Sequence, residues 1–283
     1  ALAREPYLAV AEMQGAAREA RILLAAALPL AAIEADFAAH VVEEAEVRFD
    51  EAADRVKARR VRRFGRVVLS EKPIEKPDRE TVSRALMRAV ARRGLASLPW
   101  SRAADRLRHR VEYVRRAGID GLPDFSDEAL LAGLDDWLAP HVLGRTTPAD
   151  IRESDVFDGL EALVDWEARR LLDTHAPTHF TAPTGSNVAV DYEVENGPAI
   201  SIRVQELFGL DVHPSICGGR VPLLVELLSP AHRPIQLTRD LPGFWRGSWR
   251  DVKIEMKGRY PRHVWPDDPA TAAPTTRAKP RGT

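Results

Sequence analysis

The chain has 283 residues, of which 45% are hydrophobic and 29% are charged, and its formal net charge is −1. A chain of this length can form more than one compact unit, each with its own core. The near-neutral charge excludes a global electrostatic attraction to nucleic acid or to a membrane.

The cysteine content points to a reducing compartment, and the hydropathy indicates neither a membrane span nor a signal peptide. Cys217 is the single cysteine, which excludes an internal disulfide. No run approaches the roughly 20 apolar residues of a membrane span, and no signal peptide is evident. We therefore expect a cytoplasmic location and no membrane partner.

Residues 1–77 are predicted to form a β-rich unit. Apolar periodicity predicts a hairpin around Gln14 and Gly15, then a short helix and three more strands, with the ranges 7–13, 18–26, 29–39, 41–50, 55–64 and 66–69. Five strands and one short helix suit an OB-like barrel, a fold that binds single strands, and equally suit an unspecialised β-sheet. Pro73 and Pro77 mark the boundary of this unit.

Charge is unevenly distributed in this unit. The segment 34–54 is rich in Asp and Glu and has one basic residue, whereas the segment 55–66 has no acid. Cations that engage phosphates release counterions, so a basic strand can bind nucleic acid in a salt-dependent way. The candidate contacts are Arg59, Arg60, Arg62, Arg63 and Arg66. The alternative is a solvated strand whose charge is offset by the acidic block, because opposite blocks can pair across a hairpin.

Residues 78–174 are predicted to form a helical unit. Five helix starts carry favourable cap or first-turn residues, namely Asp78, Ser101, Ser126, Thr147 and Ser154. The last of these helices is expected to run to Leu172. Arginine dominates the charge between residues 79 and 116, and acids outnumber bases between 120 and 173.

Residues 175–268 are predicted to form an α+β domain with two hairpins and a terminal helix. The expected strands are 178–182, 188–194, 199–204, 221–228 and 234–238, with a helical turn at 205–210. Gly197 in the Glu195-Asn196-Gly197 turn favours the first hairpin because glycine tolerates positive φ. The helix is expected at about 242–257, and the Pro-rich tail, residues 269–283, is expected to be disordered.

Aromatic rings alternate with cations near the end of the chain. Trp245, Trp249, Tyr260 and Trp265 are interleaved with arginines and lysines. This pattern suits a surface that binds phosphates and stacks bases. It also occurs where a terminal helix packs its aromatics into a core and leaves its charges in water, which chemistry alone favours. The candidate contacts here are Arg239, Arg246, Trp249, Arg250, Lys253, Lys257, Arg259 and Arg262.

The sequence predicts neither catalytic nor metal-binding residues. The GxxxxGK[ST] loop of ATPase motors is absent from the 283 residues. Asp127 and Glu128 copy the first letters of a DEAH box but follow a helix cap, so they are interpreted as first-turn acids. His175 and His179 are four residues apart, but Pro177 between them spoils a shared helical face for a metal.

Several unusual sequence motifs occur in this chain in the same order as in the members of one protein family. They are APTHFTAPTGS (176–186), RVQELFG (203–209), LLSPAHRPIQLTRDL (227–241), FWRGSW (244–249) and EMKGRYPRHVWPDDP (255–269). From residue 176 to the end, the chain resembles the C-terminal region of HrpB-type ATP-dependent helicases, which are bacterial DEAH-box enzymes. A looser resemblance continues upstream through LAREPYLAVAEM, GLASLPWS and SDEALLAGLDDWLAPH.

The resemblance implies a function for the chain as part of a larger enzyme. In that family a separate motor, a hydrolase, binds ATP with magnesium and acts on RNA or DNA, and its catalytic motifs match no position here. The resemblance therefore implies an accessory C-terminal segment that contacts nucleic acid without sequence preference and packs on the motor domains. The alternative is a protein-interaction module that binds no nucleic acid.

Overall fold

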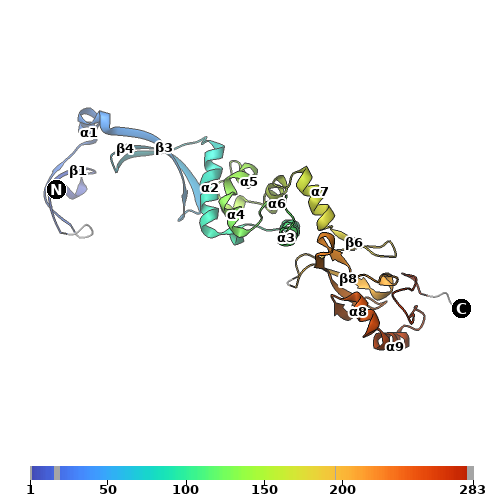
Figure 1. Cartoon of the computed structure of the whole chain (residues 1–283). Helices are drawn as coiled ribbons and strands as arrows, with labels where there is room; N and C mark the ends of the chain where they lie inside the picture. The colour runs from blue at the N-terminus through green and yellow to red at the C-terminus, as the bar shows by residue number, and fades with distance from the viewer. Residues whose placement is uncertain (1, 16–19, 195, 279–283) are drawn as a thin grey trace. The chain divides into compact units, whose positions relative to one another are not determined.

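The computed structural model describes residues 2–15, 20–194 and 196–278, and it has the predicted α+β class (Figure 1). The chain divides into two units. Unit 1 comprises Ala1–Arg92 with Val142–Asp150, and unit 2 comprises Arg93–His141 with Ile151–Thr283. This division differs from the three expected parts, because the residues of the predicted helical unit are shared between both units.

Unit 1 begins with a short 3-10 helix, Leu2–Arg4, and a hairpin. Strand β1 (Leu8–Gln14) pairs with β2 (Arg21–Ala27) in antiparallel fashion, which confirms the predicted hairpin. Residues 16–19 of the expected turn and second strand lie outside the described residues. Helix α1 (Leu30–Asp36) follows and is shorter than expected, because the chain continues as a 3-10 helix over Ala38–His40.

A three-stranded antiparallel sheet forms the rest of the β structure in unit 1. Its strands are β3 (Val41–Asp50), β4 (Arg55–Phe64) and β5 (Val67–Pro73), in the order β3-β4-β5. Asp50 shapes the turn between β3 and β4, since its Oδ1 accepts the backbone N–H groups of Ala52 and Ala53 at 3.0 Å. Within the described residues, the five strands form two separate sheets, so no closed OB-like barrel results.

Helix α2 (Arg79–Arg93) follows the sheet. Asp78 caps it as predicted, because its Oδ2 accepts the Thr81 backbone N–H at 2.8 Å. The segment Val142–Asp150 also belongs to unit 1, and the Thr146 carbonyl accepts the backbone N–H of Val56 at 2.7 Å. This bond ties β4 to a segment that is distant in sequence.

Unit 2 begins with helices. They are the 3-10 helix Leu95–Ser97, α3 (Arg102–Arg116), α4 (Asp127–Ala132), α5 (Leu134–Trp137), the 3-10 helix Ala139–Val142, α6 (Glu153–Ala162) and α7 (Trp166–His175). Ser101 and Ser126 cap α3 and α4 as predicted. The helix expected after Thr147 is the single 3-10 turn Pro148–Asp150, in unit 1.

The expected continuous helix from Ser154 to Leu172 is wrong. The chain leaves the helix after Ala162 and starts α7 at Trp166. The physical reason is Asp165, whose Oδ1 accepts the Ala168 backbone N–H at 2.8 Å and so caps a new helix.

The β strands of unit 2 are short. They are β6 (His179–Thr181), β7 (Asn187–Ala189), β8 (Ala199–Arg203), β9 (Ser215–Ile216), β10 (Val221–Pro222), β11 (Leu224–Leu228) and β12 (Pro234–Thr238). The 3-10 helices Val204–Leu207 and Cys217–Gly219 lie between them. The β11–β12 hairpin confirms the predicted second hairpin, and β8 pairs with β11 in parallel to give the order β12-β11-β8.

The first hairpin is placed differently from the prediction. It forms between β6 and β7, around residues 182–186. At the expected position, Asp191 and Ala199 form one isolated antiparallel bridge, because β8 pairs with β11 instead of continuing along β7. Glu195 of the expected turn lies outside the described residues.

The predicted terminal helix is two helices, α8 (Leu241–Arg246) and α9 (Trp249–Arg259). The break falls at Gly247, whose φ of −103° and ψ of −97° are not helical. The rings of Phe208, Phe244, Trp245 and Trp249 pack together here, and Trp249 lies 5.5 Å from Phe208 between ring centroids. These contacts form the aromatic core of the C-terminal part.

The tail is ordered as far as the structure describes it, and the expected disorder of residues 269–278 is wrong. The Pro269 carbonyl accepts the Gly209 backbone N–H at 2.9 Å, and the Thr275 N–H donates to the Gln205 carbonyl at 3.0 Å. These bonds hold the tail against the 3-10 helix Val204–Leu207. Residues 279–283 lie outside the described part.

Candidate nucleic-acid interface

The predicted basic strand β4 lies against the acidic strand β3. Their antiparallel register places Arg59 opposite Glu46 and Arg62 opposite Glu43. Arg59 Nε is 3.0 Å from Glu46 Oε2, and the same guanidinium pairs with Glu71 on β5. The opposite charge blocks of the sequence therefore pair across the hairpin, as the alternative interpretation held.

Three further arginines of β4 also pair with carboxylates. The pairs are Arg60 with Glu43 at 3.5 Å, Arg62 with Glu34 at 2.7 Å and Arg63 with Glu44 at 2.9 Å. Exposed ion pairs add only about 0–1 kcal/mol each to stability, but they cancel the local positive potential. Arg66 is exposed in the turn after β4 and has no carboxylate within ion-pair distance among the described residues. The basic run at 55–66 is therefore largely neutralised.

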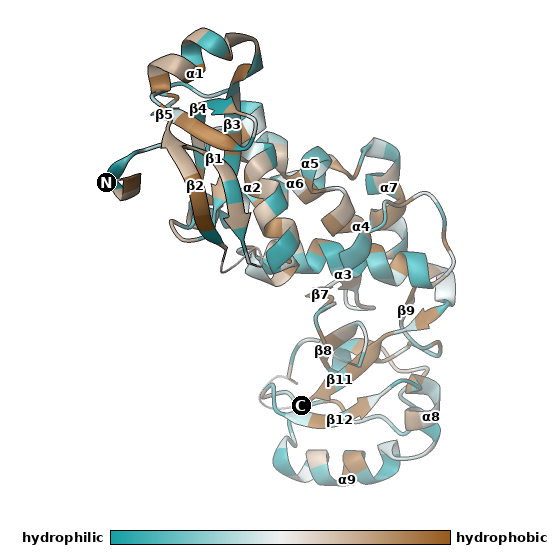
Figure 2. Cartoon of the chain, turned by 90° about the vertical axis from the view of Figure 1, so that its left-hand side faces the viewer, coloured by the Kyte–Doolittle hydropathy of each residue, from teal (hydrophilic) through white to brown (hydrophobic). Residues whose placement is uncertain are grey.

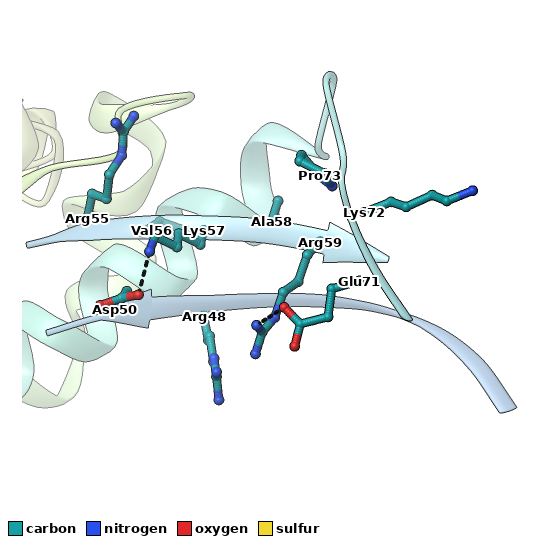
Figure 3. A pocket seen from close by; sticks show the side chains of 10 residues that line it. All are labelled: Arg48, Asp50, Arg55, Val56, Lys57, Ala58, Arg59, Glu71, Lys72 and Pro73. Carbon is teal, nitrogen blue, oxygen red and sulfur yellow. Dashed lines mark hydrogen bonds and ion pairs between the residues drawn. The ribbon is translucent and has the colours of Figure 1, made fainter. Parts of the chain in front are cut away.

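The sheet β3–β5 carries a hollow of about 520 Å³ (Figure 3). Lys57 Nζ lies 2.7 Å from Asp50 Oδ2 beside it, and Arg59 pairs with Glu71. Arg55 and Lys72 also line it, and Figure 3 shows both side chains extending away from these pairs. Its cations diverge or are paired, so this hollow does not gather positive charge at one point.

Trp249 lies in the core and not on a stacking surface. Its side chain is 2% exposed, and its indole N–H donates to the Pro266 carbonyl at 3.1 Å. Trp245 and Trp265 are also buried and donate to the carbonyls of Leu210 and Tyr260. The packing interpretation of these tryptophans is confirmed, and base stacking on Trp249 is excluded by its burial.

Some of the predicted C-terminal cations are paired. Lys253 donates to Asp267, and this hydrogen bond lowers the pKa of the Asp267 carboxyl. Arg259 lies 2.9 Å from Glu255 one turn earlier in α9. Arg262 adjoins His263, whose pKa is lowered first by burial and then by nearby arginines.

The other C-terminal cations keep their charge unpaired. Arg239, Arg246, Arg250 and Lys257 are exposed, and no carboxylate of the described chain lies within ion-pair distance of them. Arg246 nevertheless lines a hollow of about 260 Å³ together with Asp211, Asp267 and Asp268. Arg239, Arg250 and Lys257 are thus exposed and unpaired, and Lys257, after Lys253, helps to lower the pKa of the Asp267 carboxyl.

Sequence reasoning overlooked a second set of cations on α3. Arg102, Arg106, His109, Tyr113 and Arg116 recur at intervals of four and three residues, which puts them on one helical face. The arginines and the histidine of this set are exposed. The signal that could have found them is the spacing itself, read against the apolar face at Ala104, Leu107, Val111 and Val114.

The described residues contain no group of three His, Cys, Asp or Glu side chains that could hold a metal ion. Asp127 and Glu128 occupy the first turn of α4, as predicted, and Asp127 pairs with Arg108. Burial raises the pKa of the Cys217 thiol, which disfavours the reactive thiolate. No helix in the described part is long and apolar enough to cross a membrane.

The described residues form a mixed α+β fold with some exposed, unpaired cations, and the sequence contains no ATPase motif. Two family models match the chain. The model of the ATP-dependent helicase C-terminal region matches residues 137–269, and the model of the connector region of ATP-dependent RNA helicase HrpB matches residues 40–74. The second match coincides with the sheet β3–β5.

The chain belongs to the HrpB family of ATP-dependent helicases and corresponds to its C-terminal region. It is 41% identical over 286 residues to the ATP-dependent RNA helicase HrpB of Escherichia coli K12, covering 99% of this chain and 35% of the relative. Two crystal structures of E. coli HrpB, described as a DExH-box NTPase and as a DEAH/RHA helicase, are similar. The first has a TM-score of 0.68 at 40% identity over 98% of this chain and 34% of that one. The second has a TM-score of 0.60 at 35% identity, and the match covers 94% of this chain and 33% of that one.

Proposed function

We propose that the chain holds nucleic acid for an HrpB-type helicase without regard to sequence, and that it packs against the rest of that helicase in the cytoplasm. The chain spans about a third of the length of the curated relative. By this proposal, ATP and magnesium bind the rest of the helicase. The residues of this chain contribute contacts to RNA or DNA and no chemistry of their own.

The observation that carries this proposal is the unpaired charge of Arg239, Arg250 and Lys257. All three are exposed in unit 2, whereas most of the cations on β4 are paired. A free cation can replace the counterions of a phosphate, and a paired one must first leave its carboxylate. Unit 2 is thus the better source of backbone contacts than β4.

Fluorescence anisotropy with labelled single-stranded RNA and DNA tests the proposal. Changing Arg239, Arg250 and Lys257 to glutamine together should weaken binding and reduce the magnitude of the slope of log K against log salt by about 2, at roughly 0.7 for each contact. The control is a glutamine triple variant of Arg59, Arg60 and Arg63, whose charges are paired. Equal losses in both triple variants, or no binding of the wild-type chain at low salt, would refute the proposal.

A second candidate function, a protein-interaction module, is favoured by the hairpin β1–β2. Its exposed apolar side chains are Val10, Met13, Ile22, Leu23 and Leu24, and Figure 2 shows the apolar colouring along β2. An isolated two-stranded hairpin is marginally stable in water, and large apolar side chains exposed along it favour burial against a partner. The proposed occupant is the rest of the helicase chain, since this chain covers only 35% of its relative.

A two-chain reconstitution tests this contact. We expect the 283-residue chain to bind the remainder of the helicase, expressed as a separate polypeptide, and Leu24→Lys to weaken that binding. The control is Val212→Lys, because Val212 is 65% exposed in unit 2 and Leu24 is 58% exposed in unit 1. Unchanged binding of the Leu24 variant would rule out the hairpin as the contact.

A further inference from the structure

Helix α3 turns one polar face outward along its whole length. The opposite face carries Ala104, Leu107, Val111 and Val114, which are all buried. Since helical residues three and four apart share a face, this buried stripe fixes the orientation of the helix. Arg102, Arg106, His109, Tyr113 and Arg116 then form the outer stripe, which we call the α3 stripe.

The other arginines of α3 all have partners. Arg108 donates to the Phe125 carbonyl at 2.8 Å, Arg110 to the Ala176 carbonyl at 2.7 Å, and Arg115 to Asp124 at 2.7 Å. These bonds hold the fold together. The stripe arginines contrast with them, because none has a carboxylate or carbonyl partner in the described part of the chain.

The position of Arg102 works against helix stability. It is the first residue of α3, at the end where the helix dipole favours negative charge. A cation there that has no partner costs stability, and such local conflicts are typical of functional positions. Arg102 is therefore better explained by a ligand than by the fold.

A small hollow beside the stripe is lined by three arginines. Its volume is about 120 Å³, and Arg106, Arg110 and Arg169 share it with apolar neighbours. Arg110 and Arg169 are oriented by Asp173 and Glu161, which are not among its lining residues. Guanidinium groups that are held in place and face a common space suit a phosphate.

A larger hollow lies at the other end of the stripe. Its volume is about 340 Å³, and His109, Tyr113, Arg116 and Tyr192 line it with two carboxylates. One of these, Glu112, already accepts from Arg115 and the Phe125 N–H, and the other is the exposed Glu193.

Tyr113 offers a ring at this hollow. It is half-buried and packs against Tyr192, with 6.0 Å between the two ring centroids and an interplanar angle of 51°. Arg239 lies close by, because its Nη2 would be 3.4 Å, and the Tyr113 hydroxyl 3.8 Å, from a Cβ atom placed on Gly197. A supported tyrosine beside a free cation is suited to stack a base.

We propose that a single nucleic-acid strand lies along α3, with its phosphates on Arg102, Arg106 and Arg116 and one base against Tyr113. The strand path is about 21 Å long, from 14 residue steps of 1.5 Å. This inference rests on the proposed function and names the binding surface in unit 2. This surface should bind single strands in preference to duplexes, because a paired base cannot reach a tyrosine ring.

Anisotropy with the full chain tests the phosphate contacts. The labelled strand is longer than the roughly 4–16 nucleotides that one compact nucleic-acid-binding domain covers. Arg102→Glu with Arg106→Glu should weaken binding at least tenfold at low salt and reduce the salt slope by about 1.4, at roughly 0.7 per contact. The matched control is Arg84→Glu with Arg88→Glu on α2, a helix of the same length with exposed arginines four residues apart. The control should bind like the wild type.

Thermal unfolding separates binding from folding in this test. The midpoint of the α3 variant should equal or exceed that of the wild type, because glutamate in the first turn suits the helix dipole. A variant that loses binding and also unfolds early would make the stripe structural and would overturn the inference.

A strand without bases tests the contact with Tyr113. The wild-type chain should prefer an ordinary strand over an abasic strand of equal length, and Tyr113→Leu should remove that preference. If the chain binds strands and the α3 double variant binds them equally well, the strand path is wrong while the proposed function stands. If the wild-type chain binds no strand at low salt, both fail.

Discussion

Trp249→Ala measures whether the terminal tryptophans are core or surface. Trp249 is 2% exposed and packs against Phe208, Phe244 and Trp245, so its truncation should lower the free energy of unfolding by about 3–5 kcal/mol. The unpaired Pro266 carbonyl adds to this loss. Against a typical total of about 5–15 kcal/mol, the variant should be clearly destabilised.

Urea unfolding followed by tryptophan fluorescence is the appropriate assay. All six tryptophans of the chain lie in unit 2, so the signal reports on that unit. The control is Trp166→Ala, because Trp166 is 70% exposed and contacts only the guanidinium of Arg170 at 5.1 Å among the aromatic and cationic groups described. Its loss should be under about 1 kcal/mol. A stable Trp249 variant that no longer binds nucleic acid would refute the core assignment.

Two further predictions concern packing and pH. Gly159→Ala should destabilise the chain by about 1–3 kcal/mol, since its Cβ would lie 2.5 Å from the Trp137 carbonyl oxygen. Gly258→Ala should stabilise the chain by about 0.4–1 kcal/mol, because the new Cβ would meet no atom within 4 Å. Equal changes in the free energy of unfolding for the two glycine variants, measured in urea, would contradict this pair of predictions. Burial lowers the pKa of His213, so the unfolded chain takes up its proton first, and stability should fall as pH drops below about 6.5. His213→Asn should flatten this dependence while keeping an acceptor for the Leu241 N–H, and an unchanged pH profile would exclude His213 as its source.

Local patterns predicted the parts of the fold whose partners are close in sequence. The bounds of β3 and β4 were predicted correctly, because the polar turn at 51–54 lies between two long strands. Ser101 and Ser126 located helix starts, since an N-cap acts within three residues. The charge blocks also indicated the pairing of β3 with β4, although the sequence left two interpretations open.

Features that depend on distant partners were not predictable in this way. β8 pairs with β11 in parallel, and their paired residues Ala199 and Leu224 belong to segments that local periodicity cannot connect. The tail composition suggested disorder, but its order depends on backbone bonds to Gln205 and Gly209. The break between α6 and α7 was missed because one capping side chain, Asp165, overrode an apolar pattern.

The candidate interface was predicted only in part. The sequence offered the arginines of the basic run as contacts and left their pairing with the acidic block as the alternative, whereas the structure pairs most of them with acids of β3 and α1. Density along the chain does not reveal which carboxylates lie opposite. The α3 stripe was available to sequence reasoning as a helical spacing, but its lack of partners required coordinates.

Photocrosslinking of a 4-thiouridine strand to the chain, followed by mass spectrometry of the peptides, tests the central claim most directly. The claim is that free cations of unit 2 hold nucleic acid and that paired cations of β4 do not. We predict adducts on peptides from α3 and from the segment that contains Arg239 and Arg250. Adducts confined to residues 55–66 of β4 and its following turn would contradict the claim.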